Sequence, residues 1–320
     1  MARAVAVPDL IAGARNGDPR AVARLVSLVE DADPALREVM AALAPFTGRA
    51  QVIGLTGAPG VGKSTSTSAL VTAYRAKGLR VGVLAVDPSS PFSGGALLGD
   101  RVRMQAHTLD PGVYIRSMAT RGHLGGLAWA TPQVLRVLDA AGFDVLLVET
   151  VGVGQSEVEI AALADTTIVL LAPGMGDGIQ AAKAGILEIG DIFVVNKADR
   201  DGADSTVRDL RHMLTLGDQR GPGDWHPPVV RTVASRAEGV DDVVSAVDAH
   251  LAWSENTGRL TARRVRRAAG EVEAIALTTL RTRMGHLREG RRLDDLAGQV
   301  ASGVKDPYSA ADELLSEMVG

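Results

Sequence analysis

The pattern of hydrophobic and polar positions changes twice along the chain. Between residues 49 and 256, short apolar runs rich in valine, isoleucine and leucine alternate with segments of helical periodicity. Short β-branched runs are typical of buried parallel strands, and their alternation with helices predicts an α/β fold with a mostly parallel sheet. The predicted strands are Gln51–Thr56, Arg80–Asp87, Gly112–Ser117, Phe143–Thr150, Thr166–Ala172, Asp191–Asn196 and Val229–Ala234.

Both flanks of this central region have the spacing of helices. Residues 1–48 predict an N-terminal helical extension, with helix starts at Asp18-Pro19 and Asp33-Pro34 because proline is accommodated in a first turn. Residues 257–320 predict a C-terminal helical region, in which Arg259–Arg292 contains ten arginines against three glutamates. Such a charge run is either a solvated helix face or a contact surface for a partner or second subunit.

Composition narrows the class of protein. The chain has 320 residues, 46% of them hydrophobic, which provides for a large core and excludes an intrinsically disordered protein. A net charge of −4 and only 3% aromatic residues argue against nucleic acid as a partner. The absence of cysteine excludes thiolate chemistry and fits a cytoplasmic location. No stretch approaches 18 apolar residues, so we expect no membrane span.

A phosphate-binding motif follows the first predicted strand. The segment from Gly57 to Ser64 matches G-x-x-x-x-G-K-[ST] in full and leads into a helical pattern. Glycine lets backbone N–H groups approach phosphate oxygens, the helix N-terminus attracts anions, and the lysine reaches the β- and γ-phosphates. The motif predicts a P-loop NTPase. Its predicted nucleotide contacts are Gly57, Ala58, Pro59, Gly60, Val61, Gly62, Lys63, Ser64 and Thr65.

A second motif indicates which base is bound. Asn196, Lys197 and Asp199 form an N-K-x-D pattern at the end of a predicted strand. A carboxylate at Asp199 can accept from both N1–H and N2–H₂ of guanine, a pair that adenine lacks, so we expect GTP and GDP as ligands. The last strand runs into Val233, Ala234 and Ser235, whose backbone N–H groups either meet the guanine carbonyl or form an ordinary strand exit.

Three acids in loops predict a magnesium site together with the Ser64 hydroxyl. Glu149 follows an apolar strand in the Walker-B position, Asp87 ends another strand, and Asp100 lies further along the chain. Mg²⁺ prefers such oxygen ligands and retained waters. Asp87 is alternatively a turn or cap residue, and Asp100 an exposed loop acid.

Residues after a later glycine-rich loop are candidates for catalysis beside Lys63. Gln180 and Lys183 follow Pro173–Ile179 and could position water or neutralise transition-state charge. The alternative is a loop that begins a helix and carries solvated polar residues.

Taken together, the motifs resemble those of a known family. In chain order they are G-A-P-G-V-G-K-S-T, D-P-S-S-P, L-L-G-D-R-x-R-M, T-R-G-x-L-G-G, E-T-V-G-V-G-Q-S-E and N-K-A-D. This set resembles the methylmalonyl-CoA mutase-associated GTPases, the MeaB-like chaperones, which were formerly described as arginine/ornithine transport ATPases. The resemblance extends over nearly the whole chain. Val233-Ala234-Ser235 departs from the family's usual S-A-R/K.

The resemblance implies a function and partners. It implies a GTPase that binds adenosylcobalamin-dependent methylmalonyl-CoA mutase, with GTP binding and hydrolysis gating cofactor loading and protecting the mutase. It also implies a homodimer joined through C-terminal helices, metal acids at Asp87, Asp100 and Glu149, and a mobile loop at Gly174–Glu188. Two other functions remain open: a nickel-type metal-delivery GTPase, and an ATP-dependent kinase of a transport binding protein. The lack of cysteine argues against the first, and the N-K-A-D motif argues against the second.

Overall fold

The structure is a computed structural model. It describes residues 6–87, 105–107, 109–119, 130–150, 156–174, 185, 187–216, 220–288 and 291–319. The chain divides into two compact units, Met1–Arg263 and Arg264–Gly320.

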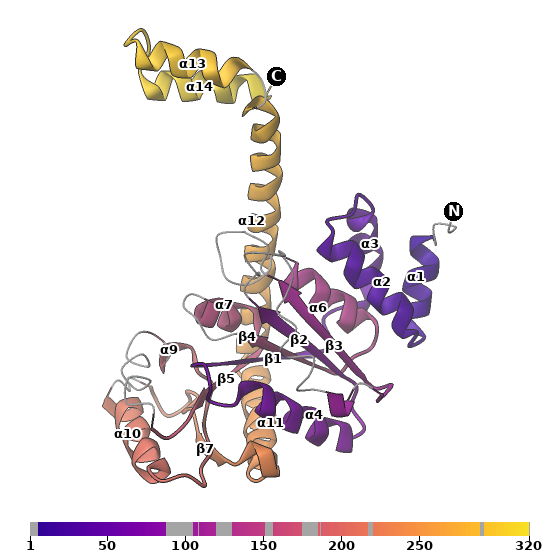
Figure 1. The fold of residues 1–320 in the computed structure, drawn as a ribbon, viewed down its shortest axis with the longest axis vertical. Coiled ribbons are helices and arrows are strands. Elements are labelled where there is room, and N and C mark those ends of the chain that lie inside the picture. The colour runs from indigo at the N-terminus through magenta and orange to yellow at the C-terminus, as the bar shows by residue number, and fades with distance from the viewer. Residues whose placement is uncertain are drawn as a thin grey trace. The chain divides into compact units, whose positions relative to one another are not determined.

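The first unit is built on a seven-stranded sheet within the described residues (Figure 1). The strand order is β3-β2-β4-β1-β5-β6-β7, and each of these neighbouring pairs is parallel. The strands are β1 (Gln51–Gly57), β2 (Val81–Asp87), β3 (Val113–Ala119), β4 (Val145–Thr150), β5 (Thr166–Leu171), β6 (Ile192–Asn196) and β7 (Val229–Thr232). The predicted α/β fold is confirmed, and the carboxyl ends of β1, β4 and β6 lie at the same edge of the sheet.

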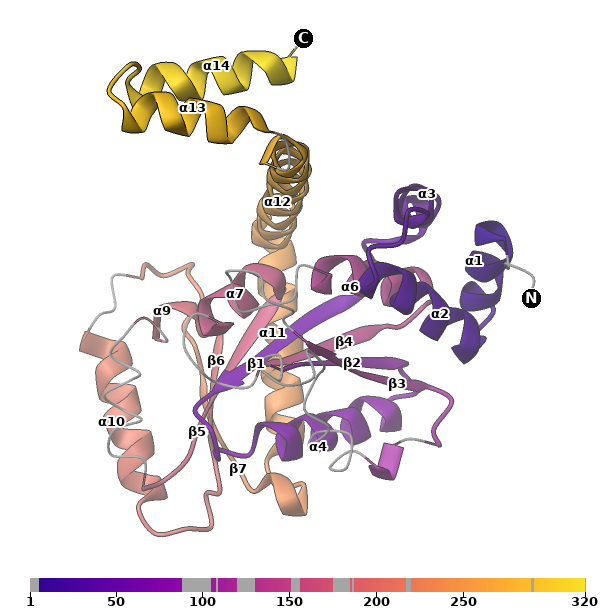
Figure 2. The same ribbon diagram turned by 45° about the horizontal axis from the view of Figure 1, so that its top comes forward.

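Helices cover both faces of this sheet (Figure 2). The helices are α4 (Lys63–Ala76) and α11 (Val240–Asn256) on one face, and α6 (Thr131–Ala140), α7 (Ser156–Leu163) and α10 (Ala203–Leu216) on the other. Along β4, Val145 and Leu147 pack toward α4, whereas Leu146 and Val148 pack toward α6. Burial on both faces explains why β4 is apolar at consecutive positions from Val145 to Val148 rather than at alternating ones.

The N-terminal helices extend the core on the α6 side. They are α1 (Val7–Arg15), α2 (Pro19–Glu30), α3 (Leu36–Leu43) and a short 3₁₀ helix, η1 (Ala44–Phe46). The predicted start at Asp18-Pro19 is confirmed, because the Asp18 carboxylate accepts from the Arg20 N–H at 2.9 Å. The start predicted at Asp33-Pro34 is wrong by two residues, since Asp33 instead caps a turn through the Ala35 N–H at 2.8 Å.

The last strand is shorter than predicted. β7 ends at Thr232, and Ala234 begins a 3₁₀ helix, η4 (Ala234–Arg236). The N–H of Arg236 donates to the Val233 carbonyl at 2.8 Å, which turns the chain out of the sheet. The other short helices in the described part are η2 (Gln105–His107) and α9 (Leu187–Ile189).

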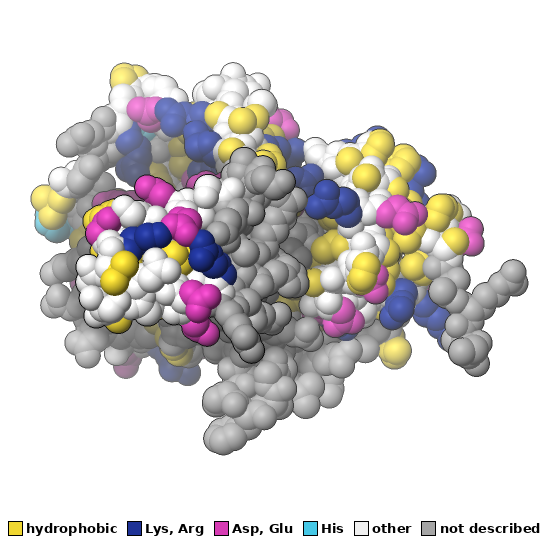
Figure 3. All heavy atoms as spheres, turned by 90° about the horizontal axis from the view of Figure 1, so that it is seen from above, with side chains coloured by type: hydrophobic (Ala, Val, Ile, Leu, Met, Phe, Trp, Pro, Cys, Tyr) yellow, Lys and Arg dark blue, Asp and Glu magenta, His cyan; other side chains and the backbone are white. Residues whose placement is uncertain are grey.

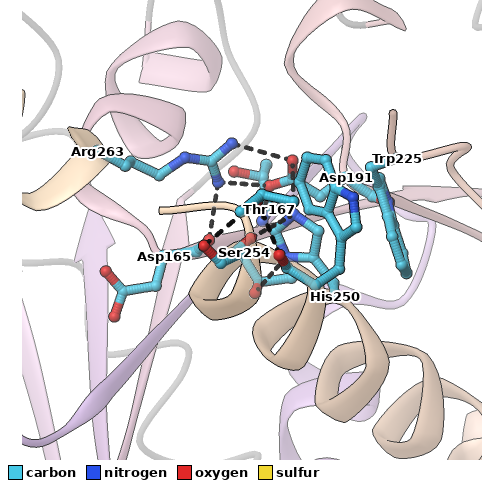
Figure 4. Close-up of polar contacts among 10 residues, drawn as sticks. Asp165, Thr167, Asp191, Trp225, His250, Ser254 and Arg263 are labelled. Atoms are coloured by element: carbon cyan, nitrogen blue, oxygen red, sulfur yellow. Dashed lines mark hydrogen bonds and ion pairs between the residues drawn. The ribbon is translucent and has the colours of Figure 1, made fainter. Parts of the chain in front are cut away.

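A buried polar cluster lies at the amino edge of the sheet, at the opposite end of β6 from Asn196 (Figure 4). The Asp191 carboxylate accepts two hydrogen bonds from Arg263, at 2.7 and 3.0 Å, and one from the Thr167 N–H at 2.8 Å. His250 Nε2 lies 3.3 Å from Asp191 Oδ1. Burial by itself raises the pKa of Asp191, but hydrogen bonds from His250 and Arg263 outweigh it and lower the pKa to about 2. The cluster fastens α11 and the beginning of α12 to the sheet.

The second unit consists of helices. α12 (Arg259–Arg288) begins in the first unit, and α13 (Arg291–Ala301) and α14 (Pro307–Val319) follow it. Leu296 and Ala310 are buried, and both Arg292 and Lys305 form ion pairs with Glu313. The predicted C-terminal helical extension is therefore confirmed.

The described surface mixes charge and apolar groups. On the face in Figure 3, Lys and Arg side chains lie interspersed with Asp and Glu side chains and with apolar ones. Among the described helices, none is both long and apolar enough to cross a bilayer.

Candidate nucleotide-binding site

The predicted phosphate loop connects β1 to α4, and two of its glycines cannot be replaced without a clash. Gly57 has a φ of 143°, and a Cβ there would lie 2.3 Å from the Leu170 carbonyl oxygen of the neighbouring strand. Gly62 has a φ of 98°, and a Cβ would lie 2.4 Å from Asn196 Nδ2. Both positions combine positive φ with close packing, so the loop needs glycine for its shape as well as for ligand approach.

Lys63 is the first residue of α4 and is only 8% exposed. Its Nζ donates to the carbonyls of Gly57 and Ala58 at 2.7 and 3.1 Å, which holds the ammonium inside the curve of the loop. The N-terminal N–H groups of α4 add partial positive charge at the same place. An anion at this helix end is therefore stabilised by one full charge and by backbone donors. Val61 and Ser64 are buried, while Pro59, Gly60 and Thr65 are exposed.

Glu149 connects the end of β4 to α4 through two hydroxyl groups. Ser64 Oγ donates to Glu149 Oε1 at 2.7 Å, and Thr67 Oγ1 donates to Glu149 Oε2 at 2.8 Å. The Glu149 side chain is only 3% exposed. Ser64 and Thr67 are three residues apart and share one face of α4, so both reach the same carboxylate.

This oxygen-rich pair fits the magnesium ion that the motifs predict. A buried carboxylate and a hydroxyl within 2.7 Å of it offer hard oxygen ligands, which Mg²⁺ prefers. Ser64 and Glu149 are the described residues that would hold the ion directly or through water. When bound, the ion would supply positive charge that offsets negative charge developing on the phosphates.

The remaining predicted metal and catalytic residues are described only in part. Asp87 is the last residue of β2, and its backbone lies one position beyond the residue paired with Thr150, at the same edge as Glu149. Asp100, Gln180 and Lys183 lie outside the described residues. Their roles stay predictions.

Asn196 joins the phosphate loop to the predicted base-binding segment. It is 3% exposed, and its Nδ2 donates to the Val61 carbonyl at 2.8 Å. Its Oδ1 accepts from Thr232 Oγ1 and from the Ala234 N–H, both at 3.1 Å. One amide side chain thus connects the P-loop, the end of β6 and the segment after β7. A displacement of one of these segments therefore strains the hydrogen bonds that hold the other two.

Lys197 and Asp199 lie at the mouth of the site. Lys197 has a φ of 56° and its Nζ donates to the Gly60 carbonyl at 2.6 Å, so its stem spans from the base segment to the phosphate loop. The Asp199 side chain is 42% exposed, and its Oδ2 lies 3.5 Å from Nη2 of Arg236. The carboxylate that would specify guanine therefore has a cation beside it.

The segment Val233–Ser235 lies beside Asn196. The Ala234 N–H donates to Asn196 Oδ1 at 3.1 Å, and the Val233 N–H donates to the Glu238 carbonyl at 3.0 Å. Val233 and Ala234 are buried, whereas Ser235 is exposed. Contact of these amides with a guanine carbonyl stays a prediction.

Fold and motif together define the class of protein. A parallel sheet with a phosphate loop after β1, an acid at the end of β4 and N-K-x-D after β6 is the arrangement of a P-loop GTPase.

Comparison with known proteins agrees with this class. A sequence profile described as methylmalonyl-CoA mutase-associated GTPase MeaB matches residues 22–288. A Pyrococcus abyssi protein that carries a GTPase name is 47% identical over 98% of this chain and 97% of its own length. The mouse mitochondrial methylmalonic aciduria type A homolog is 33% identical over 97% of this chain and 79% of its own. A crystal structure titled LAO/AO transport system kinase covers all of both chains with a TM-score of 0.71 at 26% identity.

The chain belongs to the MeaB family of methylmalonyl-CoA mutase-associated GTPases. The resemblance inferred from its motifs is confirmed, and the protein is a GTPase.

Two residues of the site were missed in the sequence. Thr67 shares the Glu149 carboxylate with Ser64, and its position three residues further along a helix could have revealed it. Arg236 contacts Asp199, although the two residues are 37 positions apart in the sequence. Arg236 is not part of any of the nucleotide-binding motifs described above.

Proposed function

We propose that this GTPase is a chaperone of adenosylcobalamin-dependent methylmalonyl-CoA mutase, and that GTP binding and hydrolysis gate loading of the cofactor and protect the mutase. The observation that carries the proposal is the family match over residues 22–288, whose description names the mutase. The relative named for methylmalonic aciduria, which aligns with 97% of this chain, supports the same function.

The proposed nucleotide chemistry assigns each part of the site a task. Lys63 and the backbone of Gly57–Gly62 hold the phosphates, and Asp199 selects guanine. Ser64 and Glu149, with Asp87 and Asp100, hold Mg²⁺. Gln180 and Lys183 act on the γ-phosphate side. Asn196 connects the base-binding segment to the phosphate loop. Binding of the base therefore helps to order the phosphate loop, and binding of the phosphates helps to order the base-binding segment.

The proposal includes a homodimer formed through α12. Val265 and Val272 are 62% and 67% exposed and lie two helical turns apart, on the same side of the helix. Ile275 and Leu280 are also exposed nearby. Substitution Val272→Asp should convert a dimer to a monomer in light scattering, whereas Thr278→Asp should leave the dimer intact; a wild-type monomer contradicts this part of the proposal.

Measuring GTP turnover with and without the mutase tests the chaperone function. We expect slow hydrolysis by the chain alone and at least a tenfold rise when apo-mutase is added, because a partner that completes a transition-state charge contributes about 10³–10⁵-fold in related enzymes. The Lys63→Ala variant should show neither the slow intrinsic GTP hydrolysis nor its stimulation by apo-mutase. Adenosylcobalamin transfer into the mutase is followed by its absorbance in parallel. Equal turnover with and without mutase, and cofactor loading independent of GTP, contradict the proposal.

An ATP-dependent kinase is the second candidate, because the solved structure that covers the whole chain is titled a transport system kinase. Competition separates the two. Unlabelled ATP should fail to displace labelled GTP at concentrations at which GTP does, since adenine lacks the donor pair that Asp199 accepts. Equal displacement by both nucleotides favours the kinase.

A further inference from the structure

Arg236 occupies part of the candidate guanine site. Its Nη2 lies 3.5 Å from Asp199 Oδ2, and its Nε lies 3.0 Å from Glu238 Oε1. The arginine thus stands between two carboxylates, of which one is the predicted guanine acceptor and the other has no part in the nucleotide motifs. The Arg236 side chain is 54% exposed. The guanidinium therefore stays hydrated when it moves away from Asp199.

The backbone that carries Arg236 is tightly held. Val233 and Glu238 form an antiparallel bridge, with N–H to carbonyl distances of 3.0 and 3.3 Å. Ala237 has a φ of 58°, and Gly239 has a φ of 74° with no room for a Cβ, which would lie 2.1 Å from the Arg231 carbonyl oxygen. The turn is held by these contacts, and Asn196 accepts a hydrogen bond from its Ala234 N–H. The backbone of Arg236 is therefore fixed next to Asp199.

We propose that Arg236 is an internal competitor for Asp199 that weakens guanine-nucleotide binding and speeds nucleotide release. A guanine base needs both carboxylate oxygens, one for N1–H and one for N2–H₂. Arg236 draws on Oδ2, so a bound base must share that oxygen with the guanidinium or displace it. Glu238 gives the displaced arginine a second carboxylate to pair with, which keeps the exchange reversible.

The size of the effect follows from exposure. Asp199 and Arg236 are 42% and 54% exposed, and ion pairs between exposed side chains are weak. We therefore expect Arg236→Ala to tighten binding by about two- to fivefold. The change should be equal for GTP and GDP, because Arg236 acts at the base and not at the γ-phosphate. The change in affinity should appear in the dissociation rate, because Arg236 competes for Asp199 while the base is bound.

The experiment measures Kd by calorimetry and the release rate of a fluorescent GDP analogue by stopped flow, on the full-length chain with Mg²⁺. Arg236→Ala is expected to bind both nucleotides more tightly and release them more slowly. Glu238→Gln should do the reverse, because it leaves Arg236 only Asp199 to pair with, and it should have no effect once Arg236 is alanine. Arg231→Ala is the matched control, since Arg231 is similarly exposed but pairs with Asp204 at 2.7 Å.

A double-mutant cycle with Asp199→Asn isolates the contact. Xanthosine nucleotides serve as the probe there, because asparagine can donate to their extra carbonyl, and the Arg236→Ala gain should disappear. The inference rests on the proposed base site, and the two fail differently. If the wild-type chain binds no guanine nucleotide, the base site itself is wrong. If it binds but Arg236→Ala leaves the affinity unchanged or lower, or shifts GTP and GDP differently, the competitor role is overturned.

Discussion

Replacing Asp191 by asparagine should destabilise the protein in a pH-dependent way. Asp191 lies at the start of β6, is 13% exposed, and pairs with two nitrogens of Arg263 at 2.7 and 3.0 Å (Figure 4). Asparagine keeps the shape but removes the charge, so the guanidinium is left partly buried without its counter-ion.

The magnitude follows from the lowered pKa of Asp191 and from the burial of its ion pair with Arg263. A carboxyl whose pKa falls from its ordinary 3.8 to about 2 on folding contributes about 2 kcal/mol at neutral pH. Removing one partner of a fully buried ion pair costs about 3–5 kcal/mol. Arg263 keeps 30% of its side chain exposed, so we expect the lower value, about 2–3 kcal/mol at pH 7.

The sign of the pH dependence follows from the lowered pKa. A carboxyl with a depressed folded-state pKa stabilises the protein above its unfolded pKa, and this contribution is lost as the pH falls from about 4 toward 2. Denaturant unfolding of wild type and Asp191→Asn, followed by circular dichroism between pH 7 and pH 2.5, measures the difference. The free energy of unfolding of wild type exceeds that of Asp191→Asn at pH 7. Most of the contribution of about 2 kcal/mol from the lowered pKa should be lost from this difference below pH 4.

Two further variants make the test specific. Asp224→Asn removes an acid that is 41% exposed and pairs with Arg259 at 3.0 Å, so it should cost less than about 1 kcal/mol. Adding Arg263→Met to Asp191→Asn should restore part of the lost stability, because no uncompensated charge remains. A gap below about 0.5 kcal/mol at pH 7, or one that does not change with pH, refutes the reasoning.

Three predictions concern the nucleotide site. Gly62→Ala places a Cβ 2.4 Å from Asn196 Nδ2 at positive φ, so unfolding should become easier by about 1–3 kcal/mol and GTP heat in calorimetry should fall; wild-type behaviour shows that the loop relaxes. Glu149→Gln weakens the acceptor of Ser64 and Thr67, and Mg²⁺-dependent GTP turnover should drop about 10- to 100-fold, with unchanged turnover counting against the metal site. Asp199→Asn should reduce GTP affinity about 10²-fold by calorimetry and favour xanthosine triphosphate; retained GTP preference places guanine recognition elsewhere.

Much of the fold was readable from local chemistry. Each predicted strand overlaps an observed one, because strands that are buried in the interior of a sheet are rich in apolar residues. The errors lie at ends: β7 stops at Thr232 and α3 begins at Leu36, since turn hydrogen bonds decide boundaries and periodicity does not record them.

The phosphate loop and the N-K-x-D segment were determined by the sequence itself, because backbone geometry and one carboxylate require those residue types at fixed local spacing. Only the tertiary structure brought Asn196 to Val61, Arg236 to Asp199 and Asp191 to Arg263, at distances of 2.8, 3.5 and 2.7 Å. These partners are 37 to 135 positions apart, so their meeting depends on the order of strands in the sheet and on where the helices return to it. Spacing along the chain carries no record of such contacts, which is why the competing cation at the base site and the anchor of α12 became visible only in three dimensions.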